Sequence, residues 1–436
     1  MKPKIFSDFL RAIGTRKAPS AAQLSELARA LVSGRGEASG VAMAGQLIES
    51  YARASDSVKG EFLSFLARDF GPDPRQLARA VEAWSAKPDP RTAQALHNAA
   101  ESPRQELIRR MNLAPGAMPQ LVQMREDVLA RMKQAPELAL VDADFTHLFS
   151  SWFNRGFLNL RRIDWSTPAD ILEKIIAYEA VHAIDSWDDL RLRLLPRDRR
   201  CFAFFHPTLP DDPLIFVEVA LTNGIPDAIA PLLASGRRPL DPDKMNTAVF
   251  YSISNCQKGL RGVSFGNFLI KQVVEELKRE LPRIKTFVTL SPVPGFMDWL
   301  KGRREAGASH FSAEDRKQLK LLDGSDWQGN AAHCAALEPV MTRALLSYLA
   351  LAKDKQDKPV DPVARFHLGN GARLEQVNWM GDKSAKGIRQ AGGFMVNYLY
   401  DLDRIERNHE RYANEGNVEL SPRLKRMVQA VQALRA

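Results

Sequence analysis

The 436-residue sequence predicts an α+β protein in which an N-terminal all-helical bundle precedes a mixed α/β domain. Two observations predict this class. Up to about residue 155, apolar residues recur at helical spacing and no strand pattern interrupts them. Beyond that position, short apolar runs bounded by turn residues alternate with a clear amphipathic helix. We therefore predict a helical domain over residues 1–155 and a second, mixed α/β domain over residues 156–436.

Four apolar stripes support the helical N-terminal domain. Each repeats apolar residues three or four positions apart, and Gly, Pro or Asp breaks separate the stripes. The stripes are Leu24-Leu27-Leu31, Val58-Phe62-Phe65-Leu66, Leu77-Val81-Trp84 and Leu121-Met124-Val128-Met132. Stripes of this kind usually form the buried face of a helix bundle, so we expect all four to be core.

The second domain begins with short apolar runs that predict β-strands. Arg200–His206 and Leu214–Leu221 are joined through a Pro-Asp-Asp-Pro segment, which predicts a hairpin or two consecutive strands. Two further strands are predicted at Ala248–Ser254 and Lys285–Leu290. A predicted helix from about Gly266 to Leu281 lies between them, and strand–helix–strand is the order of a parallel βαβ unit.

The overall composition limits the classes of partner that the protein is expected to bind. The net charge is +9, which suits an anionic partner, but the basic residues are scattered and form no long Lys/Arg block. We therefore predict no nucleic-acid-binding module. The phosphates of a small ligand such as CoA are an alternative anionic partner. No stretch approaches about 20 consecutive apolar residues, so no membrane span is predicted.

The three cysteines predict a reducing compartment. Cys201, Cys256 and Cys334 lie far apart and form no Cys-x-x-Cys pair. An odd number at such spacing argues against a disulfide framework and against a cysteine-built zinc site. The segment from Met1 to Arg16 lacks the uninterrupted apolar core of a signal peptide. A cytoplasmic location is the prediction.

A glycine-rich turn connects the predicted strand Ala248–Ser254 to the predicted helix that follows it. It reads Gln257-Lys258-Gly259-Leu260-Arg261-Gly262-Val263-Ser264-Phe265-Gly266-Asn267. Glycines let successive backbone N–H groups point inward, and the following helix adds its positive dipole end, so the turn predicts an anion nest suited to a pyrophosphate. It is neither a Walker loop nor a dinucleotide fingerprint. An ordinary Gly-rich strand–helix connection is the alternative.

The same turn resembles the acyl-CoA loop of GNAT-type acetyltransferases, with Arg261, Ser264 and Gly266 at the pattern positions. Ser264 replaces the first glycine of that pattern. In that fold two strands part at the loop, and the pantetheine arm lies between them like an added strand. The thioester then lies near the end of the next strand, where two prolines fix the backbone around Ser291. Ser291 is thus a candidate site residue, with a strand-ending turn as the alternative.

Six short sequence motifs resemble those of the malonyl-CoA decarboxylase family. They are Trp152-Phe153-Asn154-Arg155-Gly156-Phe157-Leu158, Phe250-Tyr251-Ser252-Ile253-Ser254, Gly259-Leu260-x-Gly262-Val263, Leu290-Ser291-Pro292-x-Pro294-Gly295-Phe296, Phe366-His367-Leu368-x-Asn370-Gly371-Ala372 and Asn378-Trp379-Met380. The likeness covers essentially residues 145–400. Because these motifs are rare and occur in the right order, together they support the resemblance strongly, although each motif alone does not.

The resemblance implies a helical domain followed by a GNAT-like catalytic domain that converts malonyl-CoA to acetyl-CoA and carbon dioxide, with no metal and no biotin. It implies Ser291 as the catalytic serine, described for the family as a proton acceptor, and His367 as the catalytic histidine. The substrate loop maps onto Arg261, Gly262, Val263, Ser264, Phe265, Gly266 and Asn267. Ser264-Phe265 stands where family members can carry an acidic and then an aliphatic residue.

Decarboxylation of a malonyl thioester leaves an enolate, so the site must stabilise an oxyanion and then protonate the α-carbon. We expect backbone N–H groups near Tyr251–Cys256 to supply the oxyanion donors. His367 suits the proton donor, because an ordinary histidine pKa near 6.5 lets it hold and release a proton near neutrality. His206 is a second candidate for this role.

Ser291 is expected to orient the malonyl carboxylate through a hydrogen bond, or to relay a proton to His367. A covalent serine nucleophile is disfavoured, because the chain has no Gly-x-Ser-x-Gly elbow. Tyr400 either closes the same pocket or packs in the core.

Two alternative functions remain open at this point. One is a GNAT-type acyltransferase, which needs a general base for its acceptor amine. The other is a non-catalytic acyl-CoA sensor that acts through its helical domain. For all three functions the expected partners are malonyl-CoA, acetyl-CoA or a related thioester, and we expect a homo-oligomer formed through the helical domain.

Overall fold

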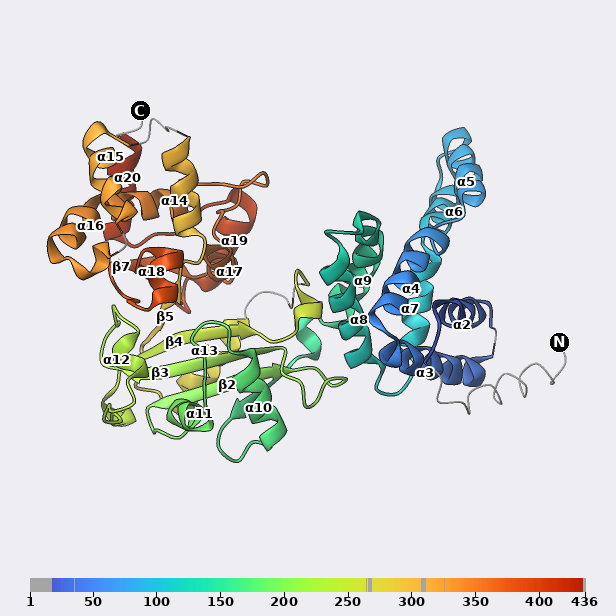
Figure 1. Cartoon of the computed structure of the whole chain (residues 1–436), viewed down its shortest axis with the longest axis horizontal. Helices are drawn as coiled ribbons and strands as arrows, with labels where there is room; N and C mark the ends of the chain where they lie inside the picture. The colour runs from blue at the N-terminus through green and yellow to red at the C-terminus, as the bar shows by residue number, and fades with distance from the viewer. Residues whose placement is uncertain are drawn as a thin grey trace. The chain divides into compact units, whose positions relative to one another are not determined.

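The computed structural model describes residues 18–34, 36–263, 265, 269–306, 311–324 and 326–433. The described chain forms two compact units. The first contains the helical residues up to Phe157, together with two short segments from later in the sequence, His206–Leu209 and Gln257–Phe265. The second contains the remaining residues and all the named strands. Figure 1 draws both units with their element labels.

The described residues of the first unit up to Phe157 form helices and their connections and no named strand, as the sequence predicts. Its helices are α2 (Ala21–Ser33), α3 (Glu37–Arg53), α4 (Asp56–Asp69), α5 (Pro74–Ala86), α6 (Pro90–Ala100), α7 (Pro103–Met111), α8 (Ala117–Arg131) and α9 (Ala139–Trp152), with short 3₁₀ turns η2 (Pro136–Leu138), η3 (Arg155–Phe157) and η5 (Lys258–Leu260). Side-chain caps set several of the starts. Ser20 and Gln23 form a capping box at α2, and Asp73 caps α5 ahead of Pro74.

Three of the four predicted apolar stripes are core, and the third is not. The stripes on α2, α4 and α8 contribute Leu24, Phe62 and Leu121, each fully buried. Helix α5 has no buried residue, and Val81 and Trp84 on its stripe are 46% and 37% exposed. The prediction that this stripe is core is wrong for the single chain. The reason is that α5 contacts mainly its hairpin partner α6, which buries no residue either.

The second unit is built on a mixed sheet. Its strands are β1 (Asn159–Ile163), β2 (Arg199–Phe205), β3 (Ile215–Thr222), β4 (Thr247–Asn255), β5 (Thr286–Thr289), β6 (Ser291–Pro292), β7 (Arg373–Asn378) and β8 (Met395–Leu399). The order across the sheet is β1-β2-β3-β4-β5-β8-β6, and β7 also pairs with β8. The pairs β1–β2, β2–β3 and β3–β4 are antiparallel, which confirms the predicted β2–β3 hairpin.

The helices of the second unit are α10 (Ala169–Tyr178), α11 (Trp187–Leu194), α12 (Ala230–Leu233), α13 (Leu269–Glu280), α14 (Phe296–Glu305), α15 (Ala313–Leu319), α16 (Ala331–Leu346), α17 (Pro362–Gly369), α18 (Ala385–Ala391), α19 (Ile405–Glu415) and α20 (Pro422–Ala433). Short turns add η4 (Pro242–Lys244), η6 (Lys320–Asp323), η7 (Trp327–Gly329) and the π-helical η8 (Ser347–Leu351). A helical unit followed by a sheet-containing unit confirms the predicted α+β class.

Strands β4 and β5 form the predicted parallel pair with α13 between them. Their register runs from Thr247 opposite Thr286 to Phe250 opposite Thr289. The N–H of Leu290 then donates to the carbonyl of Phe250, and β4 continues to Asn255 after β5 has ended. The two strands therefore part after Phe250, as expected for a GNAT-like sheet.

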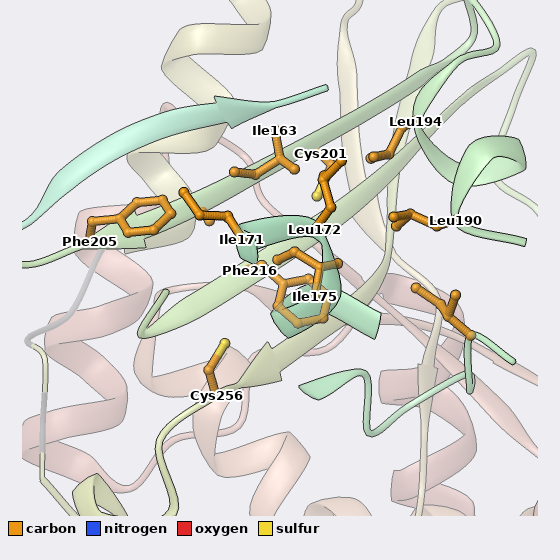
Figure 2. Close-up of a cluster of buried hydrophobic side chains, with 12 residues drawn as sticks. Ile163, Ile171, Leu172, Ile175, Leu190, Leu194, Cys201, Phe205, Phe216 and Cys256 are labelled. Atoms are coloured by element: carbon orange, nitrogen blue, oxygen red, sulfur yellow. The ribbon is translucent and has the colours of Figure 1, made fainter. Parts of the chain in front are cut away.

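One hydrophobic core lies between the sheet and helices α10 and α11 (Figure 2). Side chains of α10 point toward apolar side chains of β2 and β3, and α11 covers the same cluster. Its members include Ile171, Leu172, Ile175, Leu190, Cys201, Phe205, Phe216 and Cys256. Fully burying one such aliphatic or aromatic side chain contributes about 1.5–3 kcal/mol. This cluster holds one face of β2 and β3 against the helices.

Among the residues that the structure describes, one helical stretch, Ala331–Leu351, is long and apolar enough by composition to cross a membrane. It comprises α16 and η8, and 56% of its most apolar window is buried within the fold. Met341, Leu345 and Leu346 are fully buried. Such burial is that of a core helix in a globular domain. Cys201, Cys256 and Cys334 are free thiols, and Cys201 and Cys256 are buried.

Candidate active site

Ser291 and His367 meet inside the second unit. Ser291 Oγ lies 3.1 Å from His367 Nε2, and the two atoms share a hydrogen bond. Both residues are buried, with 6% of Ser291 and 2% of His367 exposed. The two candidate catalytic residues of the sequence thus form one buried hydroxyl–imidazole pair.

The backbone at Ser291 is held by a neighbouring strand. Ser291 and Pro292 form β6, in which Ser291 pairs with Val396 of β8. Pro292 lies opposite Met395 of β8 but cannot donate to the ladder, and β6 ends at this proline. The same strand β8 pairs with β5 at Val288, so it spans both sides of Leu290. Ser291 therefore lies in a short strand and not in the free turn that was the alternative.

His367 lies in the last turn of α17, and contacts at both ends of this helix fix the helix in place. Asp361 caps the start, accepting the N–H of Ala364 at 2.7 Å. At the other end Gly371 adopts φ +81°, and a Cβ there would lie 2.1 Å from the carbonyl oxygen of Ile405. Only glycine permits both that φ and that close approach. The Asn-Gly dipeptide that follows His367 in the motif thus ends the helix, and His367 itself lies within the helix.

Three further residues complete the hydrogen-bond chain around this pair. Tyr400 OH lies 2.8 Å from His367 Nδ1. The hydroxyl of Ser291 donates to Thr289 Oγ1 at 2.9 Å, and Thr289 Oγ1 also accepts the backbone N–H of Tyr398 at 3.1 Å. The Tyr398 ring stacks on the His367 imidazole, with ring centres 4.6 Å apart. Tyr400 is therefore a partner of His367 and not only a core side chain.

Sequence reasoning missed Thr289 and Tyr398. The signal for Thr289 was present, because residues two positions apart on a strand point to the same face of a sheet, and Thr289 lies two positions before Ser291. Tyr398 had no comparable signal. Its role arises from the pairing of β8 with three other strands, which the local sequence does not encode.

Burial controls the protonation state of this centre. Removal from water lowers the pKa of His367 to about 3, because a buried imidazolium loses its hydration. Burial also raises the pKa of Tyr400 well above its ordinary value. At neutral pH the imidazole is therefore neutral and the phenol protonated. The expectation that His367 has an ordinary pKa near 6.5 is wrong.

The predicted substrate loop is only partly within the described residues. Ser264, Gly266 and Asn267 lie outside them. Arg261 is exposed, and Gly262 is exposed with φ +80°, a left-handed conformation that favours glycine. Val263 and Phe265 are buried.

Three backbone N–H groups of the loop already have partners. Those of Leu260, Arg261 and Val263 donate to carbonyls of the same loop, at Gln257, Lys258 and Leu260. They are therefore not available to a pyrophosphate. The anion nest over Arg261–Asn267 therefore stays a prediction.

The loop is anchored to α8 through Gly259. A Cβ at Gly259 would lie 2.0 Å from the carbonyl oxygen of Val122, so only glycine allows this approach. The buried Arg125 of α8 donates to the Gly259 carbonyl at 2.8 Å and is itself paired with Asp142. The conformation of the loop's first half is thus fixed by packing within the helical unit.

His206, the second candidate for the proton donor, has other contacts. Its Nδ1 lies 2.7 Å from Thr208 Oγ1, and its ring packs 4.9 Å from that of Phe153. Burial lowers its pKa as well. These contacts place His206 within the helical unit. Within the described residues, no group of three or more His, Cys, Asp and Glu side chains could hold a metal ion.

The second unit is an α/β domain whose sheet has a parallel β4–β5 pair that ends at Phe250, and it holds a buried serine–histidine pair. The comparisons with known proteins narrow this class. The model of the malonyl-CoA decarboxylase C-terminal domain matches residues 156–436, and that of the N-terminal domain matches residues 70–153. The chain belongs to the malonyl-CoA decarboxylase family.

Solved and curated relatives agree with this assignment. The crystal structure of malonyl-CoA decarboxylase from Rhodopseudomonas palustris is 54% identical and has a TM-score of 0.91, covering 94% of this chain and 100% of that one. The enzyme from Agrobacterium vitis is also 54% identical, with a TM-score of 0.87 and coverage of 93% and 99%. The mitochondrial malonyl-CoA decarboxylase of Anser anser anser is 36% identical over 409 residues, which are 86% of this chain and 81% of the relative.

Proposed function

We propose that this protein decarboxylates malonyl-CoA to acetyl-CoA and carbon dioxide. The observation that carries the proposal is the buried hydrogen bond between Ser291 and His367, extended by Tyr400. A buried chain of hydroxyl, imidazole and phenol can move a proton without admitting bulk water. Decarboxylation of a malonyl thioester needs one proton for the α-carbon, and such a chain can supply it.

The reaction requires no covalent intermediate. The bond between the α-carbon and the carboxylate breaks, carbon dioxide leaves, and the electron pair is delocalised onto the thioester oxygen as an enolate. One proton is then added to the α-carbon. Preorganised donors at the developing oxyanion are usually the largest stabilising contribution, with one donor worth about 3–4 kcal/mol. The balance consumes one proton from solvent in each turnover.

The oxyanion donors are proposed on β4 beyond Phe250. From Tyr251 to Asn255 the strand has left its pairing with β5, so backbone groups on that edge can serve a ligand. Cys256 is a poor candidate, because its N–H donates to the carbonyl of Leu214.

The roles proposed for the two catalytic residues follow from the neutral state of the imidazole. A thioester enolate is basic enough to take a proton from a neutral O–H or N–H group. Ser291 is proposed to give its hydroxyl proton to the α-carbon, while His367 replaces that proton from the nitrogen facing Ser291. Tyr400 gives its proton to the other nitrogen, so the imidazole stays neutral, and one proton from solvent restores the phenol before the next turnover. In this scheme His367 is a relay and not a stored imidazolium.

Arg261–Asn267 is proposed to hold the CoA phosphates. Support comes from the exposed guanidinium of Arg261 and from the left-handed Gly262, which leaves the backbone open to a close ligand. Neither a metal nor biotin is needed in the proposed reaction, because the thioester itself delocalises the electron pair.

Further proposals concern assembly and location. The exposed apolar stripe of α5, with Val81 and Trp84, supports a homo-oligomer formed through the helical domain. We infer a cytoplasmic location from the free cysteines, although curated vertebrate relatives are named mitochondrial. No role for a nucleic acid or a membrane is proposed.

Incubation of the purified protein with malonyl-CoA tests the proposed function. Release of carbon dioxide together with an equal amount of acetyl-CoA supports it, provided that the His367→Gln protein releases both at least about 100-fold more slowly. Acyl transfer to an added amine without carbon dioxide release favours an acyltransferase. Tight binding of malonyl-CoA with no turnover favours a sensor.

A further inference from the structure

Thr289 is fully buried and its hydroxyl oxygen has two donors. The backbone N–H of Tyr398 donates to Thr289 Oγ1 at 3.1 Å, and the hydroxyl of Ser291 donates to the same oxygen at 2.9 Å. Because a hydroxyl oxygen has two acceptor positions, these two bonds fill both. The single proton of Ser291 is therefore directed at Thr289 and away from His367.

The direction of this bond fixes every other proton in the chain. If the Ser291 proton points to Thr289, Ser291 can only accept from His367 Nε2, which must then carry the hydrogen. A neutral imidazole has one N–H group, so Nδ1 is an acceptor. Tyr400 OH, 2.8 Å from Nδ1, is then the donor at that end.

The scaffold holds Thr289 tightly. Asn397 Nδ2 donates to the Thr289 carbonyl at 2.8 Å, and Asn397 Oδ1 accepts from Asn378 Nδ2 at 2.6 Å. Tyr398 both donates its N–H to Thr289 and stacks its ring on His367. Tyr398 of β8 thus fixes both the position of Thr289 Oγ1, which accepts the Ser291 proton, and the plane of the His367 imidazole.

The geometry points to Thr289 as a positioning residue that holds His367 in the Nε2–H tautomer, with Tyr400 donating to Nδ1. Protons in this chain then run in one direction, from Tyr400 through His367 to Ser291. When substrate arrives, rotation of the Ser291 hydroxyl is enough to redirect its proton to the α-carbon. The inference rests on the proposed function for its catalytic meaning, but the tautomer belongs to the free protein.

A matched pair of variants separates positioning from packing. Thr289→Val keeps the shape of the side chain and removes the oxygen, whereas Thr289→Ser keeps the oxygen. Without the acceptor, the Ser291 proton is free to turn toward Nε2, which favours the Nδ1–H tautomer. We expect kcat to fall about 10- to 100-fold in Thr289→Val with little change in KM, and to recover largely in Thr289→Ser.

The tautomer is read by imidazole NMR of the full-length protein labelled with ¹⁵N-histidine at neutral pH, without substrate. The His367 signals are assigned as those missing from the His367→Gln protein. We expect Nε2–H in the wild type and in Thr289→Ser, and Nδ1–H or a mixture in Thr289→Val. Tyr400→Phe removes the donor to Nδ1 and is expected to give a mixture as well.

Two results overturn the inference. One is Nδ1–H at His367 in the wild type, a measurement that needs no variant to fold. The other is a folded Thr289→Val protein, shown by an unchanged circular dichroism spectrum, with the wild-type tautomer and wild-type kcat. A wild type that holds Nε2–H but releases no carbon dioxide from malonyl-CoA instead overturns the proposed function and leaves the positioning role intact.

Discussion

Ser291 Oγ and His367 Nε2 share a hydrogen bond of 3.1 Å although 76 positions separate the two residues in sequence. A short strand presents the serine and the last turn of a helix presents the histidine. Burial keeps the imidazole neutral at physiological pH. Ser291 is therefore bonded to a neutral histidine, and this relationship shapes the predictions that follow.

Replacing His367 by Gln is expected to lower kcat for malonyl-CoA by about 10²- to 10⁴-fold, the usual contribution of a proton-transfer group. The Km should change little, because protonation of the α-carbon follows binding. Steady-state kinetics and calorimetric titration with CoA measure the two effects. A variant that kept wild-type kcat would show that His367 does not carry the proton.

Ser291→Ala is expected to lower kcat by about 10²- to 10⁴-fold, the usual contribution of a proton-transfer group, because it removes the hydroxyl that gives its proton to the α-carbon. Because the two residues share one relay, the Ser291→Ala/His367→Gln double variant should be little worse than His367→Gln alone. Rapid-quench mass spectrometry of the wild type with malonyl-CoA provides the contrast. An acyl adduct on Ser291 would replace the relay by covalent catalysis.

The pH profile should show no ionisation of His367 near its ordinary pKa. Since burial lowers that pKa to about 3, kcat is expected to carry no titration from this residue between about pH 5 and 8. The folded-state pKa is depressed, so the neutral imidazole contributes stability that is fully present above about pH 6.5. That stability is lost as pH falls toward 3.

Chemical denaturation at a series of pH values measures this loss. Between about pH 6.5 and 4 the wild type should lose more stability than His367→Gln, which has no ionisable group at this position. Parallel stability curves for the two proteins would contradict the depressed pKa.

Arg261→Glu is expected to raise the Km for malonyl-CoA about 10- to 100-fold, because a carboxylate in the loop repels the phosphates. The kcat should be largely retained. Arg75→Glu on α5 makes the same charge change at another exposed arginine and serves as the control. Equal Km values in the two variants would remove Arg261 from the substrate loop.

Gly259→Ala is expected to destabilise the protein by about 1–3 kcal/mol or more, because the new methyl group meets the Val122 carbonyl at 2.0 Å. Gly45→Ala is the matched control. Gly45 lies inside α3 with no atom within 4 Å of a Cβ, so alanine there should stabilise by up to about 1 kcal/mol. Thermal unfolding compares them, and equal melting temperatures would contradict the close approach.

Local patterns in the sequence were sufficient for the elements and for much of the fold. The helix of residues 269–280, the parallel strands on either side of it and the β2–β3 hairpin all follow from apolar spacing and turn residues. The words around Ser291 and His367 gave the two residues that the fold brings together. These features are local, because a helix or strand buries one face whose period is written along a few turns or pleats.

Tertiary structure alone decided the state of the site and the fate of one helix. The stripe on α5 spans seven positions like the core stripe on α2, but α5 contacts mainly α6 and stays exposed. Likewise, no local pattern shows that His367 is neutral or that Thr289 receives the Ser291 proton. Burial and hydrogen-bond direction depend on segments distant in sequence, since the surrounding chain removes the water and fixes the partner atoms.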